Sequence, residues 1–323
     1  MIIKEASIKL WSRLGSRATF GLATFELGKT MDNLIVLAGD TSVSGGLDRF
    51  RKTYPDKYIE VGIAEQNMIG IAAGLASEGY NVITSTFAPF HTMRCLEQIR
   101  VNLGYMRNKV TIVGLASGLV LGNLGFTHCC IEDIGILRTI PGMKIISPAD
   151  CGETVKALLA AVNVNEPVYI RLTGDINNPI VYNNDYKFEI GKSITLREGG
   201  DVTIIATGTM VHKSIEAAKL LSENGISAKI IDMHTIKPLD KEAIKKSCKD
   251  SKLIITVEEH NILGGLGSAV AEYKATLGNS PRQIILGVQD RYDKADSHEI
   301  LLEKNGLTVK QIADRVIKEY NSQ

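Results

Sequence analysis

Short apolar strands that alternate with helices run along almost the whole chain, and this pattern restricts the fold more than any other feature. In the first half, segments rich in β-branched residues recur at 34–39, 58–62, 81–87, 109–116, 143–149 and 168–173. Candidate helices lie near 63–78, 91–104, 129–139 and 151–164, and Asp150 is placed to cap the last of them. Strands that are apolar throughout are typical of a parallel sheet covered on both faces. We therefore predict an α/β domain over residues 1–178.

The alternation stops in a stretch rich in Asn, Asp and Gly, and we assign residues 179–198 to a linker with room for short edge strands. It resumes with strands at 201–208, 227–233, 252–259 and 283–288, and with helices at 211–224, 264–277 and 308–320. These elements predict a second, smaller α/β domain over residues 199–323. The predicted fold is two consecutive α/β domains, each with a mostly parallel sheet flanked by helices.

The composition of the 323 residues disfavours several classes of protein. The formal net charge is only +1, so no basic surface for nucleic acid or an anionic membrane is indicated. No apolar run approaches the roughly 20 residues that a membrane span needs. The first residues lack the apolar core and cleavage site of a secretory signal. We therefore expect a cytoplasmic protein.

The cysteines give no sign of a metal or redox site. Their number is odd and their spacing matches no zinc or redox motif. We expect buried, reduced thiols at all five positions, which are Cys95, Cys129, Cys130, Cys151 and Cys248.

Two glycine-rich segments raise the alternative of a nucleotide site. "GGLGSAV" begins at Gly264 and opens a helix, but it is not G-x-G-x-x-G and does not follow a strand turn directly. "GDTSVSGG" at 39–46 lacks the Lys-Ser/Thr pair of a phosphate-binding loop. Turn geometry and close packing explain these glycines more simply, so a dinucleotide-binding oxidoreductase is a minor alternative.

Glu65 is the most informative single residue. It follows a strand and begins a helix, and open α/β sheets bind ligands at the carboxyl ends of their strands. A carboxylate favoured by the helix dipole is the alternative explanation. The helix after Glu65 carries Gly70 and Gly74 among several alanines, so another backbone could approach it closely.

Other candidates are equally ambiguous when taken alone. Phe87 and Phe90 end the next strand and could pack in the core or form a wall for a flat ring. His128 lies in a loop that contains glycine, and His260 follows a strand in the second domain. Arg171 ends a buried strand, where either an anionic ligand or a carboxylate would serve as its partner.

In order and spacing, these segments together resemble the transketolase family. The resemblance rests on "VGIAEQNMIGIAAGLA", "TSTFAPF", "LEQIR", "GFTHCCIED", "IPGMKIISPAD" and "YIRL" in the first domain. In the second domain it rests on "TIIATGTMVHKSIEAAKLL", "IIDMHTIKPLD" and "VEEHNILGGLGSAVAE". The last three resemble the carboxy-terminal domain that transketolases share with deoxyxylulose-phosphate synthases and the beta subunits of 2-oxo acid dehydrogenases.

The resemblance implies a shared cofactor site. Such enzymes use thiamine diphosphate and Mg²⁺, and they hold the pyrimidine ring in one domain and the diphosphate in another. This chain resembles the pyrimidine-binding domain followed by the carboxy-terminal domain, and it lacks the Gly-Asp-Gly motif of the diphosphate domain. We therefore expect a split enzyme in which an amino-terminal partner subunit holds the diphosphate and the metal, with no metal ligand in this chain. The implied assembly is an α2β2 heterotetramer that contains a homodimer of this chain.

The family also implies roles for individual residues. Glu65 would hydrogen-bond the pyrimidine ring and promote activation of the thiazolium carbon, while Phe87 and Phe90 line the pocket and Asp40 lies near the cofactor. His128 would be catalytic and close to substrate. Ser44 and Arg171 would contact substrate.

Four positions depart from the pattern of the family. Met93 replaces an aromatic residue of the pocket, and Ala116 replaces a histidine that contacts the donor. Leu124 replaces an acidic residue that reads donor stereochemistry, and Phe20 aligns with an arginine that grips sugar phosphate. We therefore expect transfer of a two-carbon ketol unit from a ketose-type donor to an aldehyde, with a non-standard sugar as one possible substrate.

Two further alternatives stay open. Within the same superfamily, the chain could be a deoxyxylulose-phosphate-synthase-like subunit or a 2-oxo acid dehydrogenase beta subunit. From a different class, it could be a non-catalytic scaffold paralogue, and substitution of Glu65 distinguishes that class from an enzyme subunit.

Overall fold

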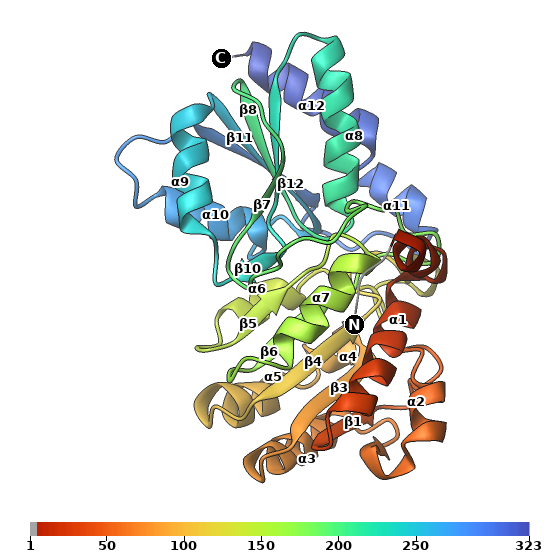
Figure 1. Ribbon diagram of the computed structural model, residues 1–323. Coiled ribbons are helices and arrows are strands. Elements are labelled where there is room, and N and C mark those ends of the chain that lie inside the picture. The colour runs from red at the N-terminus through yellow and green to blue at the C-terminus, as the bar shows by residue number, and fades with distance from the viewer. Residues whose placement is uncertain (1–4, 323) are drawn as a thin grey trace.

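Two sheets, each covered by helices on both faces, form the part of the chain that the computed structural model describes, residues 5–322 (Figure 1). The first sheet has seven strands in the order β10-β5-β6-β4-β3-β1-β2 and is parallel except for β10. Its strands are β1 (Leu34–Ala38), β2 (Tyr58–Glu60), β3 (Asn81–Phe87), β4 (Val110–Leu115), β5 (Lys144–Ile146), β6 (Val168–Arg171) and β10 (Thr235–Lys237).

Helices cover the first sheet on both sides because alternate residues of its strands point to opposite faces. Within β1, Leu34 and Val36 pack in one apolar cluster, while Ile35 and Leu37 pack in another. The helical segments are α1 (Glu5–Thr30), α2 (Asp48–Thr53), η1 (Pro55–Lys57), α3 (Glu65–Ser77), α4 (Ala88–His91), α5 (Leu96–Gln98), η2 (Ile99–Tyr105), η3 (Gly122–Leu124), α6 (Asp133–Arg138) and α7 (Cys151–Ala161).

The second sheet has five strands in the order β12-β11-β8-β9-β7, with β7 antiparallel at one edge. Its strands are β7 (Ile194–Arg197), β8 (Val202–Ala206), β9 (Ala228–Asp232), β11 (Leu253–Asn261) and β12 (Arg282–Val288). The helices that flank it are α8 (Met210–Glu223), α9 (Lys241–Asp250), α10 (Leu266–Lys274), α11 (His298–Lys304) and α12 (Val309–Asn321). These two sheets confirm the predicted fold of consecutive, mostly parallel α/β domains.

Boundaries drawn along the chain do not separate the two sheets completely. β10 lies within the predicted second domain, yet it pairs with β5 at the edge of the first sheet. β7 lies within the predicted linker, yet it pairs with β9 in the second sheet. One apolar cluster also runs from Ile35 in the first sheet to Ile254 in the second. The domains therefore share a core, and the linker contributes an edge strand.

Two helical regions differ from the expectation. The helix expected over 91–104 is divided into α4, α5 and the π-helical turn η2. The first helix, α1, is not among the predicted elements, and it packs extensively against α7. Its glycine at position 15 has a φ of 83°, and a side chain there would collide with the backbone of Asp175.

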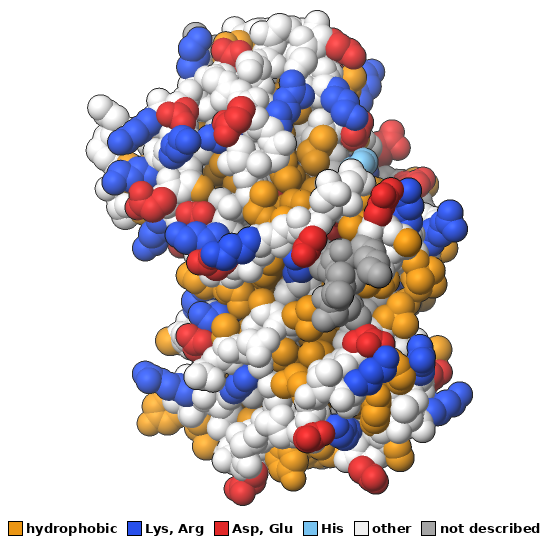
Figure 2. Space-filling view, viewed as in Figure 1, with side chains coloured by type: hydrophobic (Ala, Val, Ile, Leu, Met, Phe, Trp, Pro, Cys, Tyr) orange, Lys and Arg blue, Asp and Glu red, His pale blue; other side chains and the backbone are white. Residues whose placement is uncertain are grey.

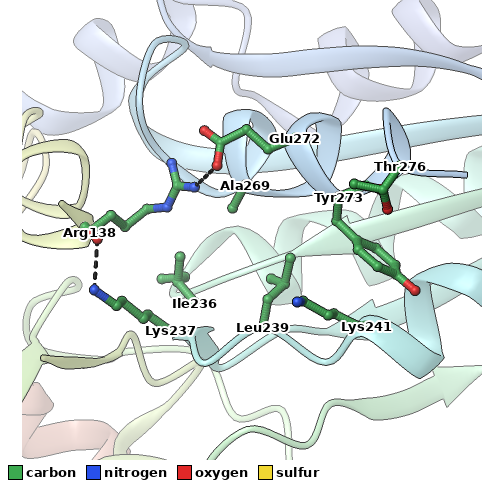
Figure 3. Close-up of a pocket in the computed structure, with 9 residues that line it drawn as sticks. All are labelled: Arg138, Ile236, Lys237, Leu239, Lys241, Ala269, Glu272, Tyr273 and Thr276. Atoms are coloured by element: carbon green, nitrogen blue, oxygen red, sulfur yellow. Dashed lines mark hydrogen bonds and ion pairs between the residues drawn. The ribbon is translucent and has the colours of Figure 1, made fainter. Parts of the chain in front are cut away.

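Polar contacts join the domains beside β10. A cavity of about 350 Å³ lies at this junction (Figure 3). Arg138 forms an ion pair with Glu272 from α10, and Lys237 donates to the main-chain carbonyls of Arg138 and Ile140. In the view of Figure 2, apolar side chains gather at the waist between the domains and over the first domain.

Candidate active site

Glu65 begins α3, just after the edge strand β2, and its side chain is only 3% exposed. Its Oε2 accepts a hydrogen bond of 2.8 Å from Nη1 of Arg94. The Arg94 guanidinium also lies over the Phe90 ring, 4.2 Å from the ring centroid. Within residues 5–322, Oε1 of Glu65 accepts no hydrogen bond. A buried carboxylate with a free acceptor is therefore available to a ligand.

Glu65 faces a cavity of about 140 Å³ at the carboxyl edge of the first sheet. The rings of Phe87, Phe90 and His128 meet edge to face beside it, with the Phe90 and His128 centroids 5.3 Å apart. Such contacts hold aromatic rings in defined orientations. The lining residues are Gly39, Asp40, Thr41, Ile63, Glu65, Thr86, Phe87, Phe90 and His128.

Adjacent strands bring most of these residues together. Asp40 follows β1, Glu65 follows β2, and Phe87 ends β3, and these three strands are neighbours in the sheet. Asp40 has a φ of 56°, and its N–H donates to Oε1 of Glu60 at 2.7 Å. This contact holds the turn after β1 against the strand beside it.

His128 comes from the loop that follows β4. Gly118 and Cys130 close this loop through two main-chain hydrogen bonds of 2.8 and 2.9 Å. The Nδ1 atom of His128 lies 3.0 Å from the Thr127 hydroxyl, and its ring contacts both phenylalanines. The loop thus places an imidazole at the rim of the cavity.

Two of the predicted site residues do not line this cavity. Ser44 lines a separate hollow with Leu14, Arg17 and Ile176, among others. Arg171 is 1% exposed, and its Nε donates to Asp133 at 2.9 Å. The sequence allowed either a ligand or a carboxylate as the partner of Arg171, and the structure shows the carboxylate. Since protein surrounds its guanidinium, we do not retain the prediction that Arg171 contacts substrate.

Both domains of the chain match models of transketolase domains. The family model for the transketolase pyrimidine-binding domain matches residues 13–176, and the model for the transketolase C-terminal domain matches residues 191–312. The chain belongs to the transketolase family. It is 41% identical to one of the subunits of the apulose-4-phosphate transketolase of Phocaeicola vulgatus, over 91% of this chain and 95% of that protein.

A solved structure shows the same fold over nearly the full length. It is described as a split-gene transketolase in an inactive β4 tetramer, with a TM-score of 0.88 and 37% identity over 95% of this chain and 99% of that chain. The transketolase of Homo sapiens is 34% identical over 96% of this chain, but this match covers only 50% of the human protein. This chain therefore corresponds to one subunit of a split transketolase, a transferase.

The departures from the family pattern can be placed on this transketolase subunit. Phe20 is 1% exposed in the apolar cluster between α1 and the first sheet, so its ring cannot contact substrate. Ala116 is buried with a φ of 51°. Met93 and Leu124 are 39% and 55% exposed. All four side chains are apolar, whereas the resemblance to the family implies polar or aromatic groups at these positions.

The second glycine motif has a structural explanation. The carboxylate of Glu258 accepts hydrogen bonds from Leu266 N and Gly267 N, at 2.6 and 2.7 Å. A side chain at Gly265 would collide with this carboxylate. The start of α10 thus binds a carboxylate of its own domain where a nucleotide site would bind phosphate.

His260 also has a structural setting. Its Nε2 accepts from Gly135 N at 3.2 Å, and its Nδ1 donates to the carbonyl of Asn261 at 2.8 Å. Burial lowers the pKa of His260 to about 4. The imidazole is therefore neutral at physiological pH and links α6 to β11.

No other site chemistry stands out in the described chain. Cys95, Cys129, Cys130 and Cys151 are buried free thiols, as expected, whereas Cys248 is only half-buried. Among residues 5–322, no cluster of three or more His, Cys, Asp or Glu side chains could ligate a metal ion. Within the same range, no helix combines the length and apolarity that crossing a bilayer requires.

Proposed function

We propose that this chain is the carboxy-terminal subunit of a two-chain, thiamine-diphosphate-dependent transketolase that is active only with its amino-terminal partner. The observation that carries the proposal is Glu65, a buried carboxylate with a free oxygen facing a cavity with aromatic walls. An aminopyrimidine ring needs these features, namely a carboxyl group that can share a proton and flat apolar walls.

The size of the cavity supports a shared site. Its volume of about 140 Å³ is well below the roughly 300 Å³ at the lower end of small-molecule sites. This chain would therefore hold only the pyrimidine end of the cofactor. The partner would hold the diphosphate and Mg²⁺.

The surface around the cavity supports a partner chain. Ile63 and Val43 are 76% and 74% exposed, and exposed apolar groups that gather near a site mark interaction surfaces. On α3, Gly70 and Gly74 face open space, where another backbone could come close. We propose that the amino-terminal subunit covers this edge, within an α2β2 assembly in a cytoplasmic enzyme.

The proposed roles follow from these positions. When bound, thiamine diphosphate supplies a carbon nucleophile that carries the two-carbon ketol unit between sugars. Glu65 would hold a proton at the pyrimidine ring, while Phe87 and Phe90 orient the ring and exclude water. His128 would donate to, or accept from, oxygen atoms of the substrate at the rim. Asp40, which lines the same cavity, would lie near the cofactor.

The proposed substrate is a sugar phosphate other than the usual pentose phosphates. We favour a ketol transferase over a deoxyxylulose-phosphate-synthase-like subunit or a 2-oxo acid dehydrogenase beta subunit. Phe20, Ala116 and Leu124 cannot offer the polar contacts that the resemblance to the family implies at these positions. The similarity to a subunit of an apulose-4-phosphate transketolase supports this inference. Ser44, at a neighbouring hollow, is retained as a candidate substrate contact.

Calorimetric titration of thiamine diphosphate and Mg²⁺ tests the shared site. We expect weak or no binding to this chain alone and tight binding to the complex with the amino-terminal subunit. Tight binding to the lone chain would contradict the split site. An assembled complex that binds no cofactor would favour the scaffold alternative.

A further inference from the structure

The loop that carries His128, residues 116–130, is held in place by the second domain. The carboxylate of Glu259, on β11, accepts a hydrogen bond of 2.7 Å from the N–H of Leu119 within this loop. Glu259 is 2% exposed, and 140 residues of sequence separate it from Leu119. A side chain at Gly118 would collide with the same carboxylate, so this glycine permits the close approach.

Other groups fix the Glu259 carboxylate in turn. His298, the first residue of α11, lies 3.0 Å from Oε1 through its Nε2, and the Thr209 hydroxyl donates to Oε2 at 3.1 Å. Burial alone would raise the pKa of Glu259, but the charge of His298 and the Leu119 N–H hold it below its usual value. Burial and the charge of Lys213 lower the pKa of His298, but the negative charge and hydrogen bond of Glu259 outweigh them, so the pKa is raised overall. The two side chains therefore form an ion pair.

The far end of the loop is held in a related way. Nη2 of Arg171 donates to the carbonyls of Cys130 and Glu259, at 3.2 and 2.9 Å. Cys130 lies two residues after His128 and closes the loop against Gly118. Arg171 thus ties the end of the loop to the strand that carries Glu259.

A segment that precedes α11 encloses the outer side of the loop. The N–H of Asp296 donates to the carbonyl of Gly122 at 3.1 Å. The Tyr292 ring lies 5.2 Å from that of Phe126, and its hydroxyl donates to Glu132 at 2.8 Å. Asp296 and Tyr292 come from the second domain, whereas the cavity residues come from the first.

We propose that Glu259, supported by His298, is a positioning residue that sets the geometry of the His128 loop, so that the second domain takes part in catalysis. This inference rests on the proposed function, since it gives the loop a purpose only if His128 contacts substrate. A positioned group loses rate steeply when its geometry relaxes. The carboxylate of Glu259 does not touch the cavity, so it acts through the loop.

Glu258 offers a matched control. It is the adjacent residue on the same strand and is also fully buried. Among residues 5–322, however, its carboxylate accepts hydrogen bonds only from Leu266 N and Gly267 N of its own domain. Glu258→Gln should destabilise the second domain without loosening the His128 loop.

The test measures amide hydrogen exchange, kcat and affinity for thiamine diphosphate. The variants are Glu259→Ala, Glu258→Gln and His298→Ala, and His298 is less buried than Glu259. In the complex and in the full chain alone, amide hydrogen exchange over residues 116–131 should quicken at least about tenfold in both Glu259→Ala and His298→Ala, but not in Glu258→Gln. With the partner, kcat should fall about tenfold or more in Glu259→Ala, while the affinity for thiamine diphosphate changes little. His298→Gln, which can still donate to Glu259, should restore most of the rate.

A double-mutant cycle with His128→Asn completes the test. If Glu259 acts through His128, adding Glu259→Ala to His128→Asn should cause little further loss of kcat. Losses that multiply, or an equal loss in Glu258→Gln after correction for folded protein, would overturn the inference. Unchanged exchange over the loop would overturn it as well. Absence of transketolase activity in the wild-type complex would instead contradict the proposed function, while hydrogen exchange would still report whether Glu259 anchors the loop.

Discussion

Glu65 follows a strand at the carboxyl edge of the first sheet, and Asp232, Glu258 and Glu259 lie at the carboxyl ends of strands in the second. Within the described chain, Glu65 has one hydrogen-bond partner, Arg94. The other three carboxyl groups accept hydrogen bonds from Tyr182, Leu266, Gly267, Leu119, Thr209 and His298.

This contrast distinguishes a carboxyl group that is open to a ligand from carboxyl groups that hold the protein together. In open α/β sheets the carboxyl edge is the place for a ligand. In the second sheet that edge abuts the first domain, and groups from the first domain, the linker and its own helices fill it. In the first sheet the edge opens into the cavity, and exposed apolar residues surround it. The same residue type at equivalent places therefore binds a ligand in one domain and joins the domains in the other.

Glu65→Gln, at the open carboxyl edge of the first sheet, should cause the largest loss of activity. Glutamine keeps an acceptor for Arg94 but cannot share a proton with a bound ring, so turnover in the complex should fall at least about 100-fold. The thermal midpoint of the lone chain should change little. Initial rates with a ketose donor, together with sedimentation to confirm assembly, provide the measurement. Full activity in an assembled complex would contradict a proton-sharing role and favour a scaffold.

The sequence predicted the parts of the molecule that depend on local pattern. Each predicted strand corresponds to an observed one, and most of them could be recognised because buried parallel strands are apolar throughout. Glu65, Phe87, Phe90 and Asp40 lie around one cavity because each follows or ends a neighbouring strand of one sheet. His128 joins them through a loop closed by main-chain bonds.

Contacts between distant segments could not be predicted in the same way. Arg94 lies within a predicted helix, and only the break between α4 and α5 brings it to Glu65. The sequence predicted an anionic partner for Arg171, but it did not indicate that this partner is Asp133. β10 is only three residues long, and its crossing to the first sheet leaves no periodic signal. Such pairings depend on how the two domains dock, which no local spacing encodes.

Asp232→Asn tests the carboxyl edge of the second sheet, which protein groups fill. Asp232 lies near Glu153 of α7, and burial raises the pKa of Asp232 to about 7 and that of Glu153 as well. The folded protein thus keeps protons that the unfolded chain releases. The stabilisation is complete below the unfolded pKa, near 4, and is lost as pH rises through about 7.

Asparagine at position 232 cannot ionise, so it should remove much of this loss. Relative to wild type, Asp232→Asn should gain stability on the order of 2 kcal/mol between pH 5 and pH 8. Denaturant unfolding at both pH values measures the change. The exposed Asp250→Asn should show no such gain. A constant difference between the two proteins at both pH values would mean that Asp232 holds no extra proton in the folded protein.

Gly70→Ala should have the smallest effect, and it tests whether the open edge is an interface. Gly70 lies inside α3 with no atom within 4 Å of the position that a Cβ would take. Alanine should therefore stabilise the lone chain by roughly 0.5–1 kcal/mol, because glycine costs more backbone entropy in a helix. If the partner's backbone packs on this face, the same change should weaken assembly, and Gly70→Gln should weaken it further. Sedimentation equilibrium with the amino-terminal subunit measures both, with Lys219→Gln on the exposed face of α8 as control. Unchanged assembly in Gly70→Gln would show that the partner covers the cavity without contacting α3.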